Sequence, residues 1–205
     1  MATNTTNKVI RYTSPKGTAK YPWLVDADTQ FVKDGQYHVQ LEVSQDNAVG
    51  IIEKLTAVLD EAYTNLCREK GKKLNKVPFF EETDGGNVVF KFKQNKIIKR
   101  KDGTTIEVKI PLFDSKGKPI TDRPKVGNGS VIKTSFTVMP YFNQINKGVG
   151  LSLRLVAVQI IDLVEYNSGN AESYGFEQEE GYEANKGNGD EDPPFETTDD
   201  EDGDY

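Results

Sequence analysis

Basic side chains crowd into one short stretch of the sequence, and they give its clearest chemical signal. Six of them fall within eleven residues: Lys91, Lys93, Lys96, Lys99, Arg100 and Lys101. Further cations follow along the chain: Lys109, Lys125, Lys133 and Arg154. A sheet face with such charges can follow a phosphate backbone and release counterions on binding. An ordinary solvated lysine face has the same composition, so the cations alone leave both interpretations open.

Aromatic residues beside a proline supply the second signal. Pro140 precedes Tyr141 and Phe142. Because proline interrupts the hydrogen-bond ladder of a strand, we expect a strand to end there and both rings to lie in a connection before Gly148. Rings in a loop beside a basic groove suit base stacking, which contributes about 1–3 kcal/mol per base and tolerates any base sequence.

Catalytic and metal-binding patterns are missing from the sequence. It has no phosphate-binding glycine loop, no nucleophile elbow and no histidine-containing metal motif. One cysteine, Cys67, and one histidine, His38, can form neither a disulfide nor a Cys/His zinc site. The acidic residues 81–84 could hold Mg²⁺, but they lead into two glycines and we interpret them as a solvated turn. We therefore expect no enzyme, no metal and no cofactor.

Charge divides the chain into two parts. Residues 1–164 hold 25 Lys and Arg against 17 Asp and Glu, a net charge of +8, whereas residues 165–205 hold one basic and 15 acidic residues, a net charge of −14. The second part has almost no aliphatic side chains, so it cannot bury enough apolar surface to offset the entropy lost on ordering. We predict one folded domain over residues 1–164 and a disordered acidic tail over residues 165–205.

The last residues of the tail are acidic and end in an aromatic ring: Asp199, Asp200, Glu201, Asp202, Asp204 and Tyr205. A tail that only confers solubility does not need a terminal ring. An aromatic anchor among acids suits docking into a basic, partly apolar groove. We interpret these residues as a partner-binding motif, with a merely solubilising tail as the alternative.

Neither a membrane span nor an export signal is expected. The apolar run 155–161 is far shorter than the roughly 20 residues that a span needs. The first residues lack a basic segment followed by an apolar one. These patterns predict a soluble protein that stays in a cytoplasm and contacts no membrane.

Alternating apolar and polar residues predict the strands that position these side chains: 18–25, 36–43, 87–93, 130–139 and 148–164, with a hairpin over 97–112 that turns at Asp102 and Gly103. In the stretch 87–93 one face enters the core and the other presents Lys91 and Lys93. Tyr21 and Trp23, on the first strand, are weaker candidates for binding, because a lone tryptophan in a β-barrel more often belongs to the core.

One helix is predicted after the second strand. Ser44 or Asp46 can cap its start, apolar residues recur every three or four positions, and Gly71 ends it. Short strands, frequent turns and one helix after the second strand predict a mainly β fold, a small Greek-key barrel of which the OB-fold is the best match.

Four stretches, in the same order, resemble the single-stranded DNA-binding protein family of T-seven-type short-tailed phages. They are Pro78-Phe79-Phe80 followed by Phe90-Lys91-Phe92-Lys93; Asp114-Ser115-Lys116-Gly117-Lys118; Met139-Pro140-Tyr141 leading to Gly148-Val149-Gly150; and the acidic end with its final aromatic. Residues 11–19 are also similar to the start of that family. The resemblance covers most of the chain.

The resemblance implies an OB-fold that binds single-stranded DNA without sequence preference, forms a homodimer and serves phage DNA replication, recombination and repair in the cytoplasm of the infected bacterial host. It implies that the tail contacts the replicative DNA polymerase and the helicase-primase, and that it occupies the DNA groove, anchored by Tyr205, when DNA is absent. The resemblance places the family's base-stacking site on Tyr141. A tryptophan of the family corresponds to a position near Asn143, where Phe142 stands in for it. An arginine of the family corresponds to a position near Asp34, beside Lys33.

Two main hypotheses remain open from sequence. The favoured one is a DNA-binding protein whose contacts are Tyr141, Phe142, Lys91, Lys93, Lys96, Lys99, Arg100, Lys101, Lys109, Arg154 and Lys33. The alternative is a protein-binding adaptor of the replication machinery without significant DNA binding. A metal-dependent nuclease is the least favoured class.

Overall fold

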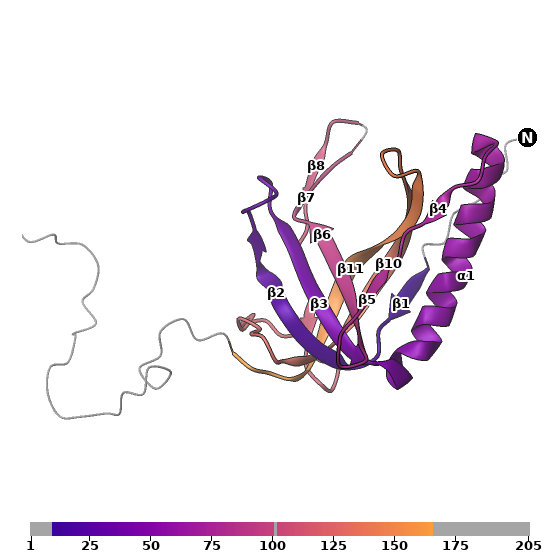
Figure 1. Ribbon diagram of the computed structural model, residues 1–205. Helices are drawn as coiled ribbons and strands as arrows, with labels where there is room; N and C mark the ends of the chain where they lie inside the picture. Colours follow the sequence, from indigo (N-terminus) through magenta and orange to yellow (C-terminus); the bar gives the residue numbers. More distant parts are fainter. Residues whose placement is uncertain (1–9, 101, 166–205) are drawn as a thin grey trace, which may run out of the picture. The chain divides into compact units, whose positions relative to one another are not determined.

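A computed structural model describes residues 10–100 and 102–165 of the chain. Strands dominate this part, and it contains one α-helix (Figure 1). The predicted mainly β fold with a single helix after the second long strand is therefore confirmed. Lys101 and, apart from Glu165, the predicted acidic tail lie outside the described residues.

Five long strands form the main sheet: β2 (Gly17–Asp28), β3 (Gln36–Ser44), β6 (Asn87–Asn95), β10 (Val131–Asn143) and β11 (Gly148–Asp162). β2 pairs with β3, β3 with β6, β6 with β11, β11 with β10, and β10 again with β2. The sheet therefore closes on itself. The contact between β6 and β11 is parallel, and the other four contacts are antiparallel.

Short strands extend the ring at its margins. β1 (Arg11–Thr13) pairs with β10, β5 (Phe80–Glu82) with β6, and both β4 (Asn75–Lys76) and β9 (Leu112–Phe113) with β11. β7 (Ile97–Lys99) and β8 (Thr105–Glu107) form a separate hairpin. Its predicted turn is confirmed, but its predicted length is wrong. Leu112 lies in β9 instead, because its side chain is buried against β11.

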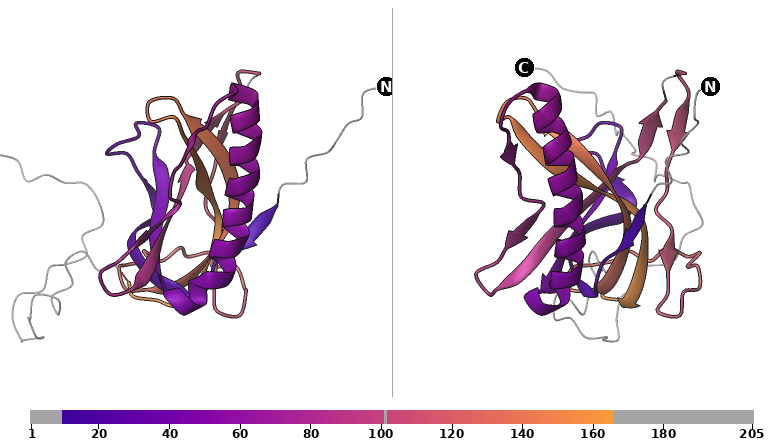
Figure 2. Two further views of the ribbon diagram at one scale, coloured as in Figure 1. Left: turned by 45° about the vertical axis from the view of Figure 1, so that its right-hand side comes forward. Right: turned by 90° about the vertical axis from the view of Figure 1, so that its right-hand side faces the viewer.

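Helix α1 (Gln45–Lys70) begins after Ser44, one of the two predicted start positions, and ends at the predicted Gly71. Gly71 ends it with φ of 63°, a left-handed conformation that glycine adopts without a steric penalty. One face of the helix buries Ala48, Ile51, Leu55 and Leu59. Figures 1 and 2 show α1 running along one side of the barrel, where it packs against β3, β6, β10 and β11.

Aromatic rings fill the interior of the ring of strands. The centroids of Phe92 and Phe136 lie 4.9 Å apart, and both side chains are buried. Tyr12 on β1 stacks on Phe136 at 5.7 Å. Because these inward residues alternate with outward ones, burying the rings also determines which side chains face solvent.

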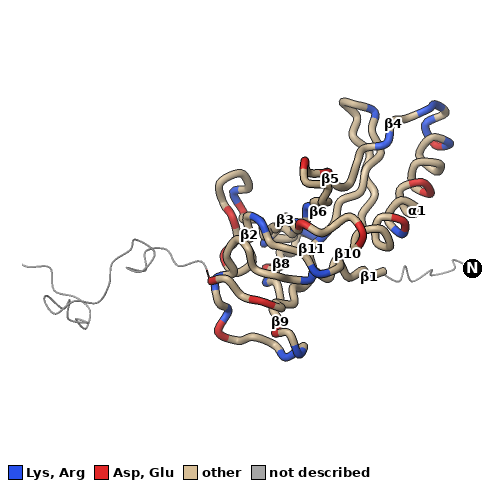
Figure 3. The backbone as a smooth tube through the Cα atoms, turned by 60° about the horizontal axis from the view of Figure 1, so that its bottom comes forward, with Lys and Arg blue, Asp and Glu red and all other residues tan. Residues whose placement is uncertain are grey.

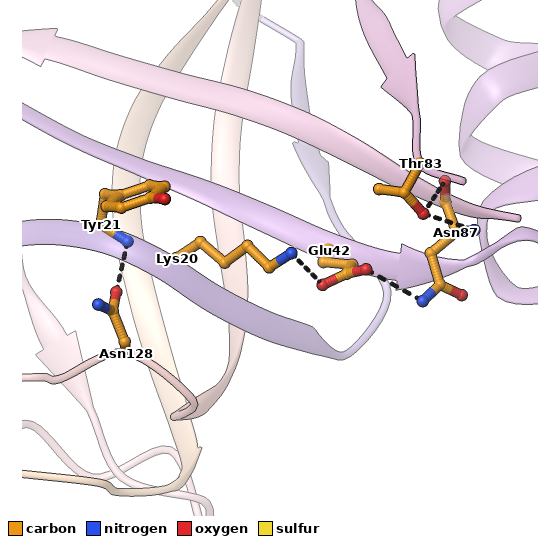
Figure 4. A network of polar contacts seen from close by, with 6 residues as sticks. All are labelled: Lys20, Tyr21, Glu42, Thr83, Asn87 and Asn128. Carbon is orange, nitrogen blue, oxygen red and sulfur yellow. Dashed lines mark hydrogen bonds and ion pairs between the residues drawn. The ribbon is translucent and has the colours of Figure 1, made fainter. Parts of the chain in front are cut away.

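A polar network on the outer surface joins three strands (Figure 4). Lys20 Nζ on β2 lies 2.6 Å from a carboxylate oxygen of Glu42 on β3. Asn87 at the start of β6 donates its side-chain N–H to the other oxygen of Glu42 at 3.0 Å. The ammonium of Lys20, and next the amide of Asn87, lower the pKa of Glu42 below its ordinary value of 4.5.

The lowered pKa of Glu42 predicts a contribution to acid unfolding. A carboxyl whose pKa is lower when folded stabilises the fold above its unfolded pKa, and that stabilisation is lost as the pH falls through the folded value. The loss of unfolding free energy between about pH 7 and about pH 3.5 should therefore be smaller in Glu42→Gln than in the native chain. Urea titrations at both pH values measure it, with Glu53→Gln on the exposed face of α1 as the matched control. An equal loss in all three chains would contradict the prediction.

Candidate nucleic-acid interface

A row of neighbouring residues crosses the outer face of four strands. Trp23 on β2 pairs in register with His38 on β3, His38 with Lys93 on β6, and Lys93 with Arg154 on β11. Trp23, Lys93 and Arg154 are exposed, whereas the residues before and after Lys93 and Arg154 are buried or half-buried. Neighbouring strands lie about 4.8 Å apart, so the row brings an aromatic ring, an imidazole and two cations together.

Two hollows lie along this row and share Lys91 and Lys93. One, of about 500 Å³, is also lined by Tyr141 and by Phe79 and Phe80. The other, of about 290 Å³, is also lined by His38 and Phe31. We call the surface formed by His38, Lys91, Lys93, Tyr141 and Phe31 the basic groove. The structure thus brings three of the predicted residues, Lys91, Lys93 and Tyr141, into one site.

Tyr141 owes its position in the basic groove to a glycine. It pairs with Gly150 across β10 and β11, and a Cβ added to Gly150 would lie 2.6 Å from the Cζ and hydroxyl of the tyrosine. The ring therefore lies against the backbone of β11, at a distance that only glycine permits. The side chain still exposes 41% of its surface. One face of the strand thus supports the ring while part of it stays open to solvent.

The predicted loop around Tyr141 and Phe142 is wrong, because β10 continues through Pro140 to Asn143. This stretch of β10 pairs only with β11 among the described strands, and proline is tolerated at a strand with one free edge. Consecutive residues of a strand point to opposite faces. Phe142 accordingly packs against the core, with Lys70 Nζ 5.7 Å from its ring centroid, and does not line the basic groove.

The expectation that Trp23 belongs to the core is also wrong, since 43% of its surface is exposed. Strict alternation would place Trp23 on the same face as the buried Ala19. The pairing of β2 with β3 shifts register between Lys20 and Trp23, and Tyr21 has φ of 50°. This bulge reverses the alternation. Asn128 supports it by accepting the backbone N–H of Tyr21 at 2.6 Å (Figure 4).

Several of the predicted cations already have carboxylate partners. Lys91 Nζ lies 2.6 Å from Glu81, Lys96 Nζ lies 3.4 Å from Glu107, and Lys99 Nζ lies 3.0 Å from Asp34. Among the described residues, no carboxylate lies within 4.0 Å of Lys93 or Arg154. Figure 3 shows the two signs of charge interspersed over the chain. Lys93 and Arg154 are therefore neighbouring cations on the row that no described carboxylate compensates.

The other predicted contacts do not line the basic groove. Arg100 is exposed in the turn of the β7–β8 hairpin, Lys109 is exposed after β8, and Lys33 is exposed in the loop between β2 and β3. That loop and that hairpin project from the same end of the barrel (Figure 1). Lys101 and the residues from Asp199 to Tyr205 lie outside the described part of the chain.

His38 is oriented within the row by a carboxylate. Asp28 accepts the backbone N–H of Gln30 at 2.8 Å and lies 3.2 Å from His38 Nε2. The Gln30 N–H, and after it the contact with His38, lower the pKa of Asp28 below its ordinary value. The ionised carboxylate thus positions the imidazole, whose ring centroid lies 6.4 Å from that of Trp23.

The chain matches the model of a family described as single-stranded DNA-binding protein, bacteriophage T7, over residues 16–163. It belongs to this family. The matched residues include all five strands of the closed ring and every described residue of the basic groove.

Two curated members of the family are similar along most of the chain. The single-stranded DNA-binding protein of Enterobacteria phage T3 is 28% identical over 194 residues, which cover 83% of this chain and 83% of that protein. The single-stranded DNA-binding protein of Escherichia phage T7 is 27% identical over an alignment of 229 positions that covers 95% of this chain and 98% of that protein.

Solved structures agree with this membership. The crystal structure of the T7 protein superposes with a TM-score of 0.69 at 25% identity, covering 76% of this chain and 93% of that chain. The single-stranded DNA-binding protein of bacteriophage Enc34, solved in complex with single-stranded DNA, has a TM-score of 0.54 at 11% identity, covering 76% of this chain and 88% of that chain. The second likeness shows the fold alone.

Sequence reasoning missed Phe31, a residue that is 88% exposed and lines a hollow with His38 and Lys93. The available signal was a large apolar residue in a polar stretch between two predicted strands. The acidic residues 81–84 hold no metal cluster. Within residues 10–100 and 102–165, no three His, Cys, Asp or Glu side chains are grouped to bind a metal ion. In the same residues no helix has the length and apolar character of a membrane span.

The contact between Tyr141 and Gly150 predicts a measurable coupling. Gly150→Ala should lower the free energy of unfolding by about 1–3 kcal/mol, because the added methyl overlaps the ring. In a Tyr141→Ala background the overlap is gone, and the same substitution should change stability by less than about 0.5 kcal/mol. Urea unfolding of the four chains measures both values. An equal cost in both backgrounds would show that the backbone, and not the ring, requires glycine.

Proposed function

We propose that this protein binds single-stranded DNA without sequence preference along the basic groove. The observation that carries the proposal is the row from Trp23 through His38 and Lys93 to Arg154, with Tyr141 in the adjoining hollow. Phosphates would lie on the two uncompensated cations, and bases would stack on the exposed rings. The T3 and T7 relatives are named for the same ligand.

The topology supports assigning this barrel to the OB-fold. The five long strands β2, β3, β6, β10 and β11 can be numbered 1 to 5 along the chain. Neighbours in the closed ring then follow the order 1-2-3-5-4, and strand 4 pairs again with strand 1. OB-folds bind oligonucleotides on the face of their second and third strands and with the loops between strands one and two and between strands four and five. Here that face is β3 and β6, and those loops join β2 to β3 and β10 to β11. The basic groove lies on this face.

Charge compensation distinguishes the cations of the groove from one another. Lys91 already has Glu81 at 2.6 Å, so a phosphate at Lys91 would have to replace or share that carboxylate. Lys93 and Arg154 have no such competitor among the described residues. Because DNA affinity rises with the counterions released, the two uncompensated cations should contribute most.

Substituting both uncompensated cations tests the proposal. Lys93→Ala with Arg154→Ala should weaken binding of labelled oligo-dT by roughly tenfold or more and reduce the slope of log affinity against log salt by about 1.4, since each phosphate contact on a single strand contributes about 0.7. Lys91→Ala should have a smaller effect. Lys54→Ala, which removes an exposed cation on α1, should have none. Fluorescence anisotropy at several salt concentrations measures all four chains. Failure of the native chain to bind at moderate salt would favour the adaptor function instead.

We propose further that residues 165–205 act as an acidic tail that competes with DNA for the groove and contacts the replicative DNA polymerase and helicase-primase. The protein would serve phage DNA replication, recombination and repair as a homodimer in the cytoplasm of the infected bacterial host, and it would not act as an enzyme. The net charges of +8 and −14 on the two parts of the chain support the competition between tail and DNA.

Removing the tail should tighten DNA binding at low salt, by about tenfold or more, and the gain should shrink as salt screens the tail. The cut is best made after Ser168, because Val126 bridges to Glu165 and Ser130 bonds to Val164, and both contacts belong to the barrel. Replacing Tyr205 by alanine in the intact chain should give part of the gain. Equal affinities of the cut and intact chains at low salt would exclude the competition.

A further inference from the structure

The row of outward residues does not end at Arg154. Arg154 pairs with Thr137 on β10, and Thr137 pairs with Arg11 on β1. Their neighbours Phe136 and Tyr12 point inward and stack on each other. Arg11 is exposed, so the outer face carries a continuous line of register partners from Lys93 on β6 to Arg11 on β1.

At Arg11 this line reaches a further hollow, of about 540 Å³. It lies over β1, β9, β10 and β11, and its lining includes Arg11, Lys133, Ser135, Phe113 and Gln159. We call it the far hollow. No Asp or Glu lines it, and among the described residues no carboxylate lies within 4.0 Å of Arg11 or Lys133. Its two cations are therefore uncompensated, like those of the row.

More positive charge borders the far hollow in the turn after β9, which Figure 3 shows with basic positions in blue. Gly117 in this turn lines the hollow, and Lys116 and Lys118 on either side of it are exposed. The carboxylate of Asp114 forms hydrogen bonds within this turn. Its Oδ1 accepts the backbone N–H groups of Lys116 at 2.9 Å and Lys118 at 2.8 Å. The rim of the hollow thus adds to its attraction for an anion.

The distance between the two sites matches a short run of nucleotides. Three steps between neighbouring strands separate Lys93 from Arg11, and at about 4.8 Å a step they span about 14 Å. A stacked strand advances about 3.4 Å for each phosphate, so about four nucleotides bridge the two sites. Arg154 lies on this path and can bind a phosphate between the two sites.

We propose that the single strand held in the basic groove continues over Arg154 and Thr137 into the far hollow, where Arg11 and Lys133 bind its phosphates. This inference rests on the proposed function and extends it, because it names a second subsite for the same ligand. Continuity of the row and the absence of carboxylates from the lining select nucleic acid as the occupant. Phe113, half-buried in the lining, offers an aromatic ring to a base.

The two subsites make affinity depend on the length of the oligonucleotide. An oligomer of about three nucleotides is too short to reach from Lys93 to Arg11, whereas one of about twenty can occupy both sites, given about 3.4 Å per nucleotide. Substitutions in the far hollow should therefore leave short oligomers unaffected. Substitutions on the row should weaken both lengths.

The experiment compares Arg11→Ala with Lys133→Ala, made together, against the native chain, with short and long oligo-dT. The expected result is unchanged affinity for the short oligomer, a roughly tenfold loss for the long one and a salt slope reduced by about 1.4 for the long one alone. Arg11→Lys with Lys133→Arg keeps the charges and should keep the long-oligomer affinity. Thermal unfolding by circular dichroism checks that all chains fold.

The outcomes separate this inference from the proposed function. If the native chain binds neither length, the proposed function fails; if it binds both and the double alanine chain matches it on the long oligomer, only the far hollow is excluded. Equal losses on both lengths would place Arg11 and Lys133 within the basic groove and overturn the inference. If the double alanine substitution changes affinity for the long oligomer in the intact chain but not in a chain cut after Ser168, residues 169–205, and not DNA, occupy the far hollow.

Discussion

The parallel contact between β6 and β11 is the constraint on which the rest of the barrel depends. It pairs Phe92 with Leu153 and Lys93 with Arg154. The first pair is buried and closes the core, and the second pair is exposed on the outer face. Closing the ring of strands therefore forces two cations into neighbouring positions. Their repulsion, on the order of 1 kcal/mol in solvent, is a cost of folding that an anion on the outer face would relieve.

Carboxylates neutralise several of the cations that lie off this row. Lys20 pairs with Glu42 and Lys91 with Glu81, and Lys96 and Lys99 at the β7–β8 hairpin also have acidic partners. The register partners Lys93 and Arg154 keep their charges without such a partner, although the described part of the chain has many acids. A phosphate chain would be attracted more strongly to Lys93 and Arg154 than to these paired lysines, because nearby opposite charges cancel within a Debye length of about 8–10 Å.

Two local backbone features position the aromatic rings beside this charge. The bulge at Tyr21 turns Trp23 outward, and its unusual φ of 50° is held by the bond to Asn128. Gly150 lets the ring of Tyr141 rest on the neighbouring strand. Such strained or crowded backbone persists only where the surrounding structure supports it, and it occurs often at binding sites. Rings fixed in this way lose little entropy when a base stacks on them.

The sequence by itself determined the elements with strong local periodicity. The helix over residues 45–70, the strand carrying Lys91 and Lys93 and the long last strand follow from spacing, because local burial patterns repeat every 3.6 or 2 residues. It also determined the opposite charges of the two parts of the chain. The strand ending at Pro140 was mispredicted, because whether proline ends a strand depends on which edge has a partner.

The assembly of the site was decided only by the tertiary structure. Trp23, Lys93 and Arg154 come from three strands that are far apart in the sequence, and only the register of the closed ring makes them neighbours. Register depends on contacts between strands that no single stretch contains, and one bulge is enough to reverse the face of Trp23. Whether a lysine has a carboxylate partner likewise depends on which residues the fold brings next to it. The composition of the sequence supplied the cations and rings, and the closure of the barrel decided which of them meet.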